Sequence, residues 1–329
     1  MRRRKRAEIV STGSAVPDRI LTNQDLEKMV ETSDEWIVSR SGIRERRITD
    51  DQTTTSDLAA LAARRALEQA NISAEELDLI IVGTATPDMV FPSTACLVQD
   101  LIGAKNAAPM DLVAACSGFV YALTVADAFI SSGTYETILC IGAETLSKFT
   151  DYQDRNTCVL FGDAAGAIVL RPTEEDKGVL ETYLGGDGHL WHLLHLPAGG
   201  SRLPASHETV DQRLHFIKMS GNEVFKSAVK AMGDAALRVL QQAGLTGKDI
   251  DLLITHQANI RIIQATAKRV KLPMDKVYVN IDRYGNTSAA SIPLAMDEAY
   301  RKGLSKPGDI WLLVAFGGGF TWGSALIRW

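Results

Sequence analysis

The chain has 329 residues, of which 46% are hydrophobic and 23% charged, and its formal net charge is −5. That length suits two cores better than one, and the composition is typical of a soluble globular protein. The acidic balance argues against a protein built as a whole to hold nucleic acid. No apolar run approaches the roughly 18 residues that span a bilayer, and the basic residues 1–6 lack the apolar segment of a signal peptide.

The four cysteines predict a reducing, cytoplasmic setting. They are Cys96, Cys116, Cys140 and Cys158, and no two of them have the C-x-x-C spacing of zinc sites. We therefore expect neither a structural metal nor a disulfide framework, because a chain of this kind in the cytoplasm keeps its thiols reduced.

In chain order, strand and helix patterns alternate. We expect a strand near residues 7–10, a turn at Pro17-Asp18, a helix from Thr22-Asn23, a long amphipathic helix over Thr55–Ala70 that begins at Ser56-Asp57, and an apolar strand over residues 77–82. The alternation continues to Pro172 and predicts an α/β protein with packed layers.

The second half of the sequence repeats the first. Residues 65–81 and 238–254 share one helix–loop–strand pattern at a constant offset of 173, as Asp78 and Asp251 illustrate. The ends of the halves, residues 161–171 and 316–328, also resemble each other. Two matched segments in the same order indicate a duplicated α/β unit rather than a solenoid. We place the boundary in the polar run after residue 172, giving domains at 1–172 and 173–329.

An irregular insert over residues 185–220 interrupts the second half, and we expect it to shape a substrate tunnel. It contains His189, His192 and His195, a spacing that suggests a metal site. On a helix these side chains would spread over about 120° of arc, and no carboxylate or cysteine completes a ligand set. We therefore interpret the histidines as satisfied or solvated side chains.

The rest of the chain is organised around Cys116. The apolar residues 109–113 read as a buried strand, small residues flank the cysteine, and a helical pattern begins at Phe119. A thiol at a helix N-terminus is expected to have a depressed pKa and to react as a thiolate. The alternative is a buried structural cysteine, which is the commoner fate of a single cysteine.

Two further strand ends carry candidate partners for Cys116. His256 follows the predicted strand at residues 251–254, and Asn286 follows the one at 277–281. In open α/β sheets such strand ends gather around ligands. Each residue alone reads as a strand-end histidine or a turn former, but together with Cys116 they suit covalent thiol chemistry. The glycines at 317–319 could aim a backbone N–H at an oxyanion.

At this point the sequence resembles a known family, β-ketoacyl-acyl carrier protein synthase III of the thiolase superfamily. The resemblance runs from about Glu8 to Trp329. Its motifs are residues 32–37, 41–47, 115–118, 161–166, 256–259, 285–288 and 317–323. It implies a thiolase-like α/β fold in which two duplicated halves form α-β-α-β-α layers.

The resemblance also implies an activity, the decarboxylative Claisen condensation that initiates bacterial fatty acid synthesis. Cys116 would take the acyl group from acyl-CoA, usually acetyl-CoA, and release CoA. His256 and Asn286 would hydrogen-bond the enolate that forms when malonyl-acyl carrier protein loses CO₂. The backbone N–H groups of Cys116 and Gly318 would form the oxyanion hole. No cofactor and no metal is implied.

Contacts to CoA follow from the same resemblance. Trp36 and Arg155 would sandwich the adenine, Arg40 would reach the phosphates, and Asn222 would contact the pantetheine arm. The alternative for each is a surface packing residue or a solvated charge, and Arg155 could simply pair with its neighbour Asp154.

Protein partners are implied as well. Because the family is homodimeric, Phe91 would close the acyl pocket of the partner subunit. Arg261 would meet the acidic carrier protein, although a surface arginine on a helix is usually just solvated.

Rival families with the same fold are less well supported. Elongating condensing enzymes use Cys-His-His, whereas Asn286 stands here in place of the second histidine. Thiolases carry a second active-site cysteine near the C-terminus, but the last cysteine here is Cys158. Hydroxymethylglutaryl-CoA synthases add a catalytic glutamate, for which Glu75 and Glu76 on a loop are poor candidates.

Two alternatives stay open. One is a Cys-His-Asn condensing enzyme of specialised metabolism that takes another acyl donor. The other is a non-catalytic acyl-CoA-binding scaffold, against which the intact set of Cys116, His256 and Asn286 argues. The sequence does not reveal the length or branching of the acyl donor.

Overall fold

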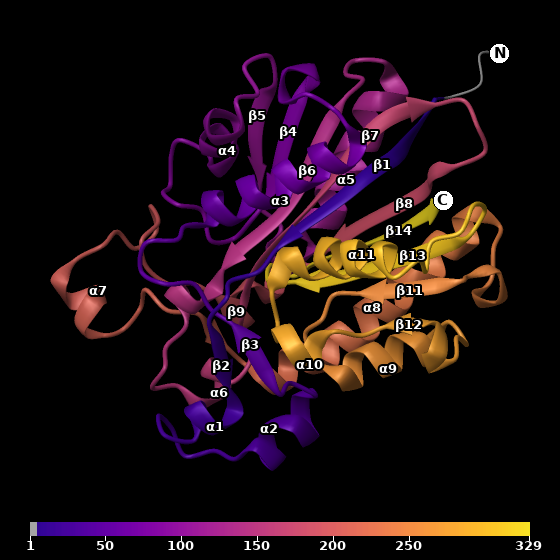
Figure 1. The fold of residues 1–329 in the computed structure, drawn as a ribbon. Coiled ribbons are helices and arrows are strands. Elements are labelled where there is room, and N and C mark those ends of the chain that lie inside the picture. The colour runs from indigo at the N-terminus through magenta and orange to yellow at the C-terminus, as the bar shows by residue number, and fades with distance from the viewer. Residues whose placement is uncertain (1–4) are drawn as a thin grey trace.

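Two five-stranded sheets form the centre of the computed structural model, which describes residues 5–329 (Figure 1). Residues 1–4, which carry most of the basic start of the sequence, lie outside the described part. The first sheet has the order β1-β7-β6-β4-β5 and the second the order β12-β11-β13-β14-β8. The first sheet contains β1 (Arg6–Ala15), β4 (Leu79–Gly83), β5 (Ala108–Leu112), β6 (Ile138–Thr145) and β7 (Asp163–Thr173). The second contains β8 (Gly178–Gly186), β11 (Leu252–Thr255), β12 (Val277–Tyr278), β13 (Ile310–Gly317) and β14 (Thr321–Arg328).

The two sheets have the same pairing pattern. β4 runs parallel to both β5 and β6, and β11 runs parallel to both β12 and β13, while the other pairs in each sheet are antiparallel. β4 reads Leu-Ile-Ile-Val-Gly and is buried along its whole length, as expected for a parallel strand covered on both faces. The remaining strands form two small antiparallel sheets of two strands each: β2 (Ile20–Thr22) with β3 (Glu45–Arg47), and β9 (Leu194–His195) with β10 (Lys218–Met219).

Helices lie outside and between the sheets, which gives five layers (Figure 1). α3 and α4 cover the outer face of the first sheet, α5 and α11 lie between the sheets, and α8 and α9 cover the second sheet. The main helices are α3 (Thr55–Ala70), α4 (Thr94–Ile102), α5 (Gly118–Ser132), α8 (Gly221–Ala243), α9 (Ile260–Arg269) and α11 (Ser291–Arg301). The shorter ones are α1 (Asn23–Leu26), α2 (Asp34–Ser41), α6 (Arg155–Cys158), α7 (His207–Asp211) and α10 (Ile281–Tyr284).

Three of the predicted elements differ most from the structure in their bounds, while the strands predicted at 77–82, 109–113 and 251–254 are shifted by one or two residues. The first strand is longer than residues 7–10, because β1 pairs with β7 as far as Ala15. The helix from Thr22-Asn23, whose early turns we expect to include Met29, already ends at Leu26. The strand predicted over 277–281 stops at Tyr278, and Ile281 begins α10 instead.

The predicted helix Thr55–Ala70 is confirmed, although its start signal is not the expected one. Thr54 is the N-cap, and it forms a reciprocal capping box with Asp57. Leu58, Ala62 and Ala66 are among its buried residues, so the apolar stripe faces the first sheet.

One segment corrects the expectation that no apolar run is long enough for a bilayer. Ala115–Ser132 reaches that length with a mean hydropathy of 1.3. Its residues Phe119, Val120 and Leu123 are buried against strands of both sheets, which is typical of a core helix in the middle layer.

The division into domains at residues 172 and 173 stays a proposal. It is supported by the strand sets, since the first sheet uses strands up to Thr173 and the second begins at Gly178.

Candidate active site

Cys116 lies in a tight corner between β5 and α5. Residues Ala115–Ser117 form a 3₁₀ turn that leads directly into α5 at Gly118. Ala115 has φ 45°, a left-handed conformation that is uncommon for a residue with a side chain and that concentrates at functional sites. A Cβ added at Gly317 would lie 2.6 Å from the Cys116 nitrogen. The backbone at the end of β13 therefore packs directly against this corner, with no side chain between them.

The expected depression of the thiol pKa is wrong for the structure. The pKa of Cys116 is raised to about 12, chiefly by burial; a hydrogen bond from the Ser288 side chain lowers it, and the nearby Glu144 carboxyl adds to the rise. Desolvation of the thiolate therefore outweighs the stabilisation that the helix N-terminus offers to a thiolate. The resting sulfur is a protonated thiol at neutral pH.

His256 stands directly after β11 and is 3% exposed. Its Nδ1 lies 3.1 Å from the Ser291 hydroxyl at the start of α11, and its backbone N–H donates to Val314 at 2.8 Å. Burial lowers the pKa of His256 to about 4, so the imidazole is neutral at physiological pH.

Asn286 is 7% exposed and is fixed through its backbone and its side chain. Its N–H donates to the Leu160 carbonyl at 2.8 Å, and its own carbonyl accepts from Gly162 at 3.0 Å. Its Oδ1 accepts the backbone N–H of Ser288 at 2.9 Å, which leaves the Nδ2 amide as the group that can donate to a ligand.

Two serines connect His256 and Asn286 to the Cys116 corner, although neither His256 nor Asn286 is among the residues that line the cavity beside Cys116. Ser288, two residues after Asn286, lines a cavity of about 180 Å³ together with Cys116 and Gly318. Ser291, one helical turn later, holds His256. The other residues that line the cavity are Ala85, Thr86, Ala115, Leu146, Phe149, Phe161, Leu194, His195, Leu196 and Ile217. Four of these come from the insert over residues 185–220.

Trp36, Arg40 and Asn222 line a separate hollow of about 330 Å³. The guanidinium groups of Arg155 and Arg40 lie over the Trp36 ring, 4.5 and 4.8 Å from its centroid. Arg155 also donates to the Glu31 carbonyl at 3.0 Å, while Asp154 accepts from the Asn156 N–H at the start of α6.

Arg261 and Phe91 are both at the surface. Arg261 is exposed on α9 with its guanidinium 4.9 Å from the centroid of the Phe225 ring. Phe91 is 83% exposed in the loop between β4 and α4, and it does not line the Cys116 cavity of its own chain.

The histidines of the insert do not form a metal cluster. Within residues 5–329 no three His, Cys, Asp or Glu side chains are grouped closely enough to hold a metal ion. The Trp191 ring instead packs edge-on against His192 and His195, at centroid distances of 6.0 and 5.5 Å.

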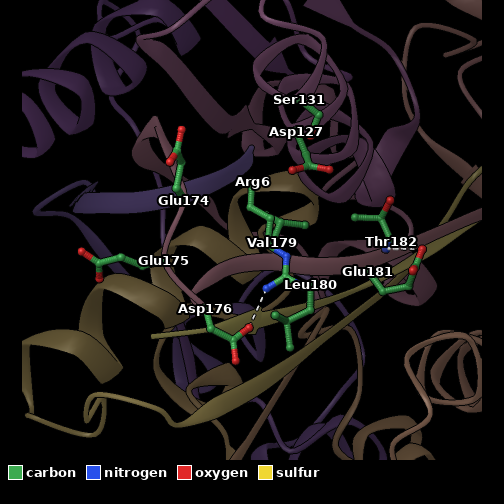
Figure 2. A pocket seen from close by; sticks show the side chains of 10 residues that line it. All are labelled: Arg6, Asp127, Ser131, Glu174, Glu175, Asp176, Val179, Leu180, Glu181 and Thr182. Carbon is green, nitrogen blue, oxygen red and sulfur yellow. Dashed lines mark hydrogen bonds and ion pairs between the residues drawn. The ribbon is translucent and has the colours of Figure 1, made fainter. Parts of the chain in front are cut away.

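A further hollow, of about 280 Å³, lies at the other end of α5 from Cys116 (Figure 2). Its wall is mainly acidic, with Asp127, Glu174, Glu175 and Glu181, while Arg6 donates to Asp176 across it at 2.8 Å. None of the predicted site residues lines this hollow.

Sequence reasoning missed three residues of the site: Glu144, Ser288 and Ser291. Ser288 and Ser291 are present in the motif around Asn286, and their contacts with Glu144 and His256 explain why serines stand there. Glu144 had one signal in the sequence, a carboxylate at the end of an otherwise apolar strand.

Comparison with known proteins identifies close relatives over the whole chain. Two family models match, 3-oxoacyl-[acyl-carrier-protein (ACP)] synthase III over residues 110–188 and its C-terminal counterpart over residues 240–329. The β-ketoacyl-[acyl-carrier-protein] synthase III of Caldanaerobacter subterraneus subsp. tengcongensis is 61% identical over 323 residues, which cover 98% of each chain.

Solved structures agree with the sequence matches. The 3-oxoacyl-[acyl-carrier-protein] synthase III of Aquifex aeolicus is 49% identical, has a TM-score of 0.91, and is matched over 98% of this chain and 100% of its own. The priming β-ketosynthase of the R1128 polyketide pathway is 33% identical, with a TM-score of 0.91 over 100% and 97% of the two chains. These structures confirm the predicted thiolase-like α/β fold.

Proposed function

The chain belongs to the β-ketoacyl-[acyl-carrier-protein] synthase III family, and from that premise we propose how its residues divide the reaction. It is an acyl-transferring condensing enzyme that joins an acyl-CoA to malonyl-acyl carrier protein and initiates fatty acid synthesis. The observation that carries the assignment of residues is the cavity that Cys116, Ser288 and Gly318 line together.

We assign acyl transfer to Cys116. The sulfur attacks the thioester carbonyl of the acyl-CoA, the bond to the CoA sulfur breaks, and the thiol proton leaves with CoA. The developing oxyanion is placed to accept from the N–H groups of Cys116 and Gly318, because Gly317 lets this backbone approach the cysteine. Glycine is needed at position 317, since a side chain would meet the Cys116 nitrogen.

We assign decarboxylation to His256 and Asn286. We assign the Ser291 hydroxyl as the donor in its hydrogen bond with Nδ1, so that the neutral imidazole carries its proton on Nε2 and can donate it to an enolate oxygen. Asn286 Nδ2 supplies the second donor, because Oδ1 is occupied by Ser288. Two neutral donors stabilise the charge that develops when CO₂ leaves, and the resulting carbanion attacks the acyl-Cys116 carbonyl.

We propose that the hollow beside Trp36 receives the CoA nucleotide. Arg155 and Arg40 supply positive charge for the phosphates, and Asn222 lies at the same hollow for the pantetheine arm. An adenine between Trp36 and Arg155 requires a gap of about 7 Å between the two planes, because each stacked contact takes about 3.5 Å. Since Arg155 now lies 4.5 Å from the ring centroid, its side chain must swing away when CoA binds.

The acyl cavity supports a short donor, and we propose acetyl-CoA. Its volume of about 180 Å³ is small, and the walls are mainly apolar side chains such as Leu146, Phe149 and Ile217. The much higher identity to fatty acid synthases than to the polyketide priming enzyme favours the primary pathway.

A homodimer is the second element of the proposal. β5 is the edge strand of the first sheet, and edge strands offer unpaired backbone groups to another chain. Exposed apolar residues accompany this edge: Val90 and Phe91, at 84% and 83%, lie in the loop after β4, and Val113, at 78%, directly follows β5. A second copy would cover them, and Phe91 would then close the partner's acyl cavity.

We infer a cytoplasmic location, supported by four free cysteines and by the soluble precursors that this reaction uses.

The proposal is tested by intact mass after incubation with a panel of acyl-CoAs from two to eight carbons. We expect an acyl adduct on the protein, strongest with acetyl-CoA, and none on Cys116→Ala. Phe91→Ala is expected to shift the preference toward longer donors, since each methylene in such a pocket is worth about 1–3 kcal/mol. A protein that forms no adduct with any donor would be a binding scaffold, and an unchanged preference would remove Phe91 from the pocket.

A further inference from the structure

A buried carboxylate lies behind the active site. Glu144 is the next-to-last residue of β6, and it is 0% exposed. Three consecutive residues of the first half donate to it: Thr86 Oγ1 at 2.6 Å, Ala85 N–H at 3.1 Å and Thr84 Oγ1 at 3.3 Å, all to Oε2.

The second half supplies the remaining donors. Ser288 Oγ donates to Glu144 Oε1 at 2.8 Å, and the Ala289 N–H points to the same oxygen at 3.5 Å. Glu144 therefore joins the two halves of the molecule directly at the corner that follows Asn286. Five donors converge on two oxygens, and the ionised carboxylate is the form that accepts from all of them. Burial raises the pKa of the Glu144 carboxyl, and these hydrogen bonds act in the opposite direction, in favour of the ionised form.

Ser288 needs such support. It has φ 47°, a left-handed backbone conformation that is costly for a residue with a side chain and that persists only where its surroundings impose it. Its N–H is also the group that holds Asn286 Oδ1 at 2.9 Å. If Ser288 relaxed, Asn286 would lose the contact that determines which end of its amide faces the substrate.

From these contacts we propose that Glu144 is a positioning residue of the condensation. It anchors Ser288, and through the Ser288 backbone it keeps the Asn286 amide turned with Nδ2 toward the enolate. This inference rests on the proposed roles of Cys116 and Asn286, and it adds a residue to which neither the sequence motifs nor the proposed mechanism gives a role.

The same carboxylate acts on Cys116. Glu144 raises the pKa of the thiol, whereas the Ser288 side chain lowers it. A Ser288 hydroxyl that donates to Glu144 cannot at the same time donate to the sulfur, so the anchor also withdraws a hydrogen bond from a thiolate. Burial is the main cause of the raised pKa of the Cys116 thiol, and Glu144 adds to it, so the carboxylate favours the protonated resting thiol.

The chain offers a matched control in Asp163. This carboxylate is also 0% exposed at a strand end, and it accepts from the backbone and the hydroxyl of both Thr49 and Ser147. It contacts neither Ser288 nor Asn286 in the hydrogen bonds of the described chain. Loss of Asp163 therefore reports what removal of any buried, fully bonded carboxylate does to the fold.

The experiment compares Glu144→Gln, Glu144→Asp, Ser288→Ala and Asp163→Asn with the wild type. One readout is the rate of iodoacetamide alkylation of Cys116 against pH, which needs no substrate and so stands even if the proposed function fails. The other is CO₂ release from labelled malonyl-carrier protein on the acetylated enzyme, separated into kcat and KM. Thermal unfolding is recorded for each variant.

We expect Glu144→Gln to alkylate several-fold faster than wild type at pH 8, because loss of the carboxylate charge lowers the pKa of the Cys116 thiol, and to lose about 10- to 100-fold in kcat for CO₂ release with little change in KM. Glu144→Asp keeps the charge but is too short for Ser288, so its alkylation stays near wild type while CO₂ release falls. Ser288→Ala should also lose CO₂ release without faster alkylation. Asp163→Asn should unfold at lower temperature and show neither effect.

Wild-type alkylation and CO₂ release in a folded Glu144→Gln would overturn the proposal, and so would equal effects in Asp163→Asn. If Glu144→Gln does not fold, wild-type CO₂ release in Glu144→Asp overturns it instead. A wild-type enzyme that never releases CO₂ would refute the proposed function, and the alkylation profiles would then still decide whether Glu144 controls the thiol.

Discussion

The corner that carries Cys116 and the corner that follows Asn286 are two versions of one piece of backbone. Ala115 and Ser288 differ by 173 in residue number, the offset of the sequence repeat, and they have φ angles of 45° and 47°. Each begins a 3₁₀ turn that continues into a helix of the middle layer, α5 in one case and α11 in the other. The two halves thus share a strained backbone conformation, while the side chains beside it differ. The first corner carries Cys116, the proposed nucleophile, and the second follows Asn286, the proposed amide donor.

The strand ends that face these corners diverged as well. β6 and β13 pair with β4 and β11 in the same register, Leu79 with Ile138 and Leu252 with Trp311, so Glu144 and Gly317 are equivalent positions. Glu144 anchors the second corner with a carboxylate. Gly317 has no side chain, and its backbone packs directly against the first corner. The second corner is therefore held by hydrogen bonds, whereas the first corner lies against backbone without a side chain, which suits its proposed role in binding an oxyanion.

The largest effect should come from the first corner. Cys116→Ala is expected to abolish both the acetyl adduct and overall condensation, because no other residue in the proposed mechanism carries the acyl group. Adduct mass and product formation check this on the same preparation. Residual adduct on a different residue would show that the first corner is not the acylation site.

Variants of Asn286, at the second corner, and of His256 should affect decarboxylation rather than acyl transfer. His256→Ala and Asn286→Ala are expected to take up acetyl from acetyl-CoA yet lose CO₂ release by about 10²–10³, the usual cost of removing one donor to a developing oxyanion. Both half-reactions are measured on each variant. If Asn286→Ala released CO₂ normally but failed to acylate, the amide would belong to the nucleophile's corner and the division between corners would fall.

Two glycine variants, one beside each corner, test whether the corners act separately. A Cβ at Gly317 would lie 2.6 Å from the Cys116 nitrogen, and one at Gly142 would lie 2.2 Å from the Ala289 carbonyl oxygen. Each alanine variant should destabilise the protein by about 1–3 kcal/mol through overpacking. We expect Gly317→Ala to slow acylation about tenfold and Gly142→Ala to slow CO₂ release by a similar factor. Equal damage to both half-reactions by both variants would mean that the corners are mechanically coupled.

The sequence predicted the duplication, the helix Thr55–Ala70 and the strand-end setting of Cys116 and His256, because these depend on hydrophobic period and local signals. The strand-end setting of Asn286 was wrong, since β12 stops at Tyr278 and the short helix α10 precedes Asn286. It could not predict the raised pKa of Cys116, since burial by the second half and the nearby Glu144 charge are long-range effects. The same holds for Glu144 itself. Its partners Thr84, Thr86 and Ser288 lie 58 to 144 residues away, so no local pattern reveals them.

A smaller effect is expected where the second half meets the carrier protein. Arg261→Glu on α9 should raise KM for malonyl-carrier protein several-fold and leave acylation by acetyl-CoA nearly unchanged, and the effect should shrink at high salt. Arg269→Glu is the matched control, because it makes the same charge change on the same helix at a residue whose guanidinium pairs with Asp234 at 3.0 Å. A similar rise in KM in the control would point to the net charge of the helix rather than to Arg261.

The smallest effect concerns the free energy of unfolding and follows from the burial of His256, which contacts the helix that begins after the second corner. His256 is buried in its neutral form with a pKa of about 4, whereas the unfolded chain protonates its histidine near 6.5. As pH falls through that window the unfolded state binds the extra proton, so the free energy of unfolding should decrease, by about 3 kcal/mol in total once pH is below 4. Denaturant unfolding of wild type and His256→Gln between pH 7 and pH 4 isolates this contribution, since the other titrating groups are shared. We expect the two curves to converge as the pH falls, because only the wild type loses this part of its stability. Parallel curves would mean that His256 is not held neutral, and the assignment of Nε2–H as an enolate donor would lose its physical basis.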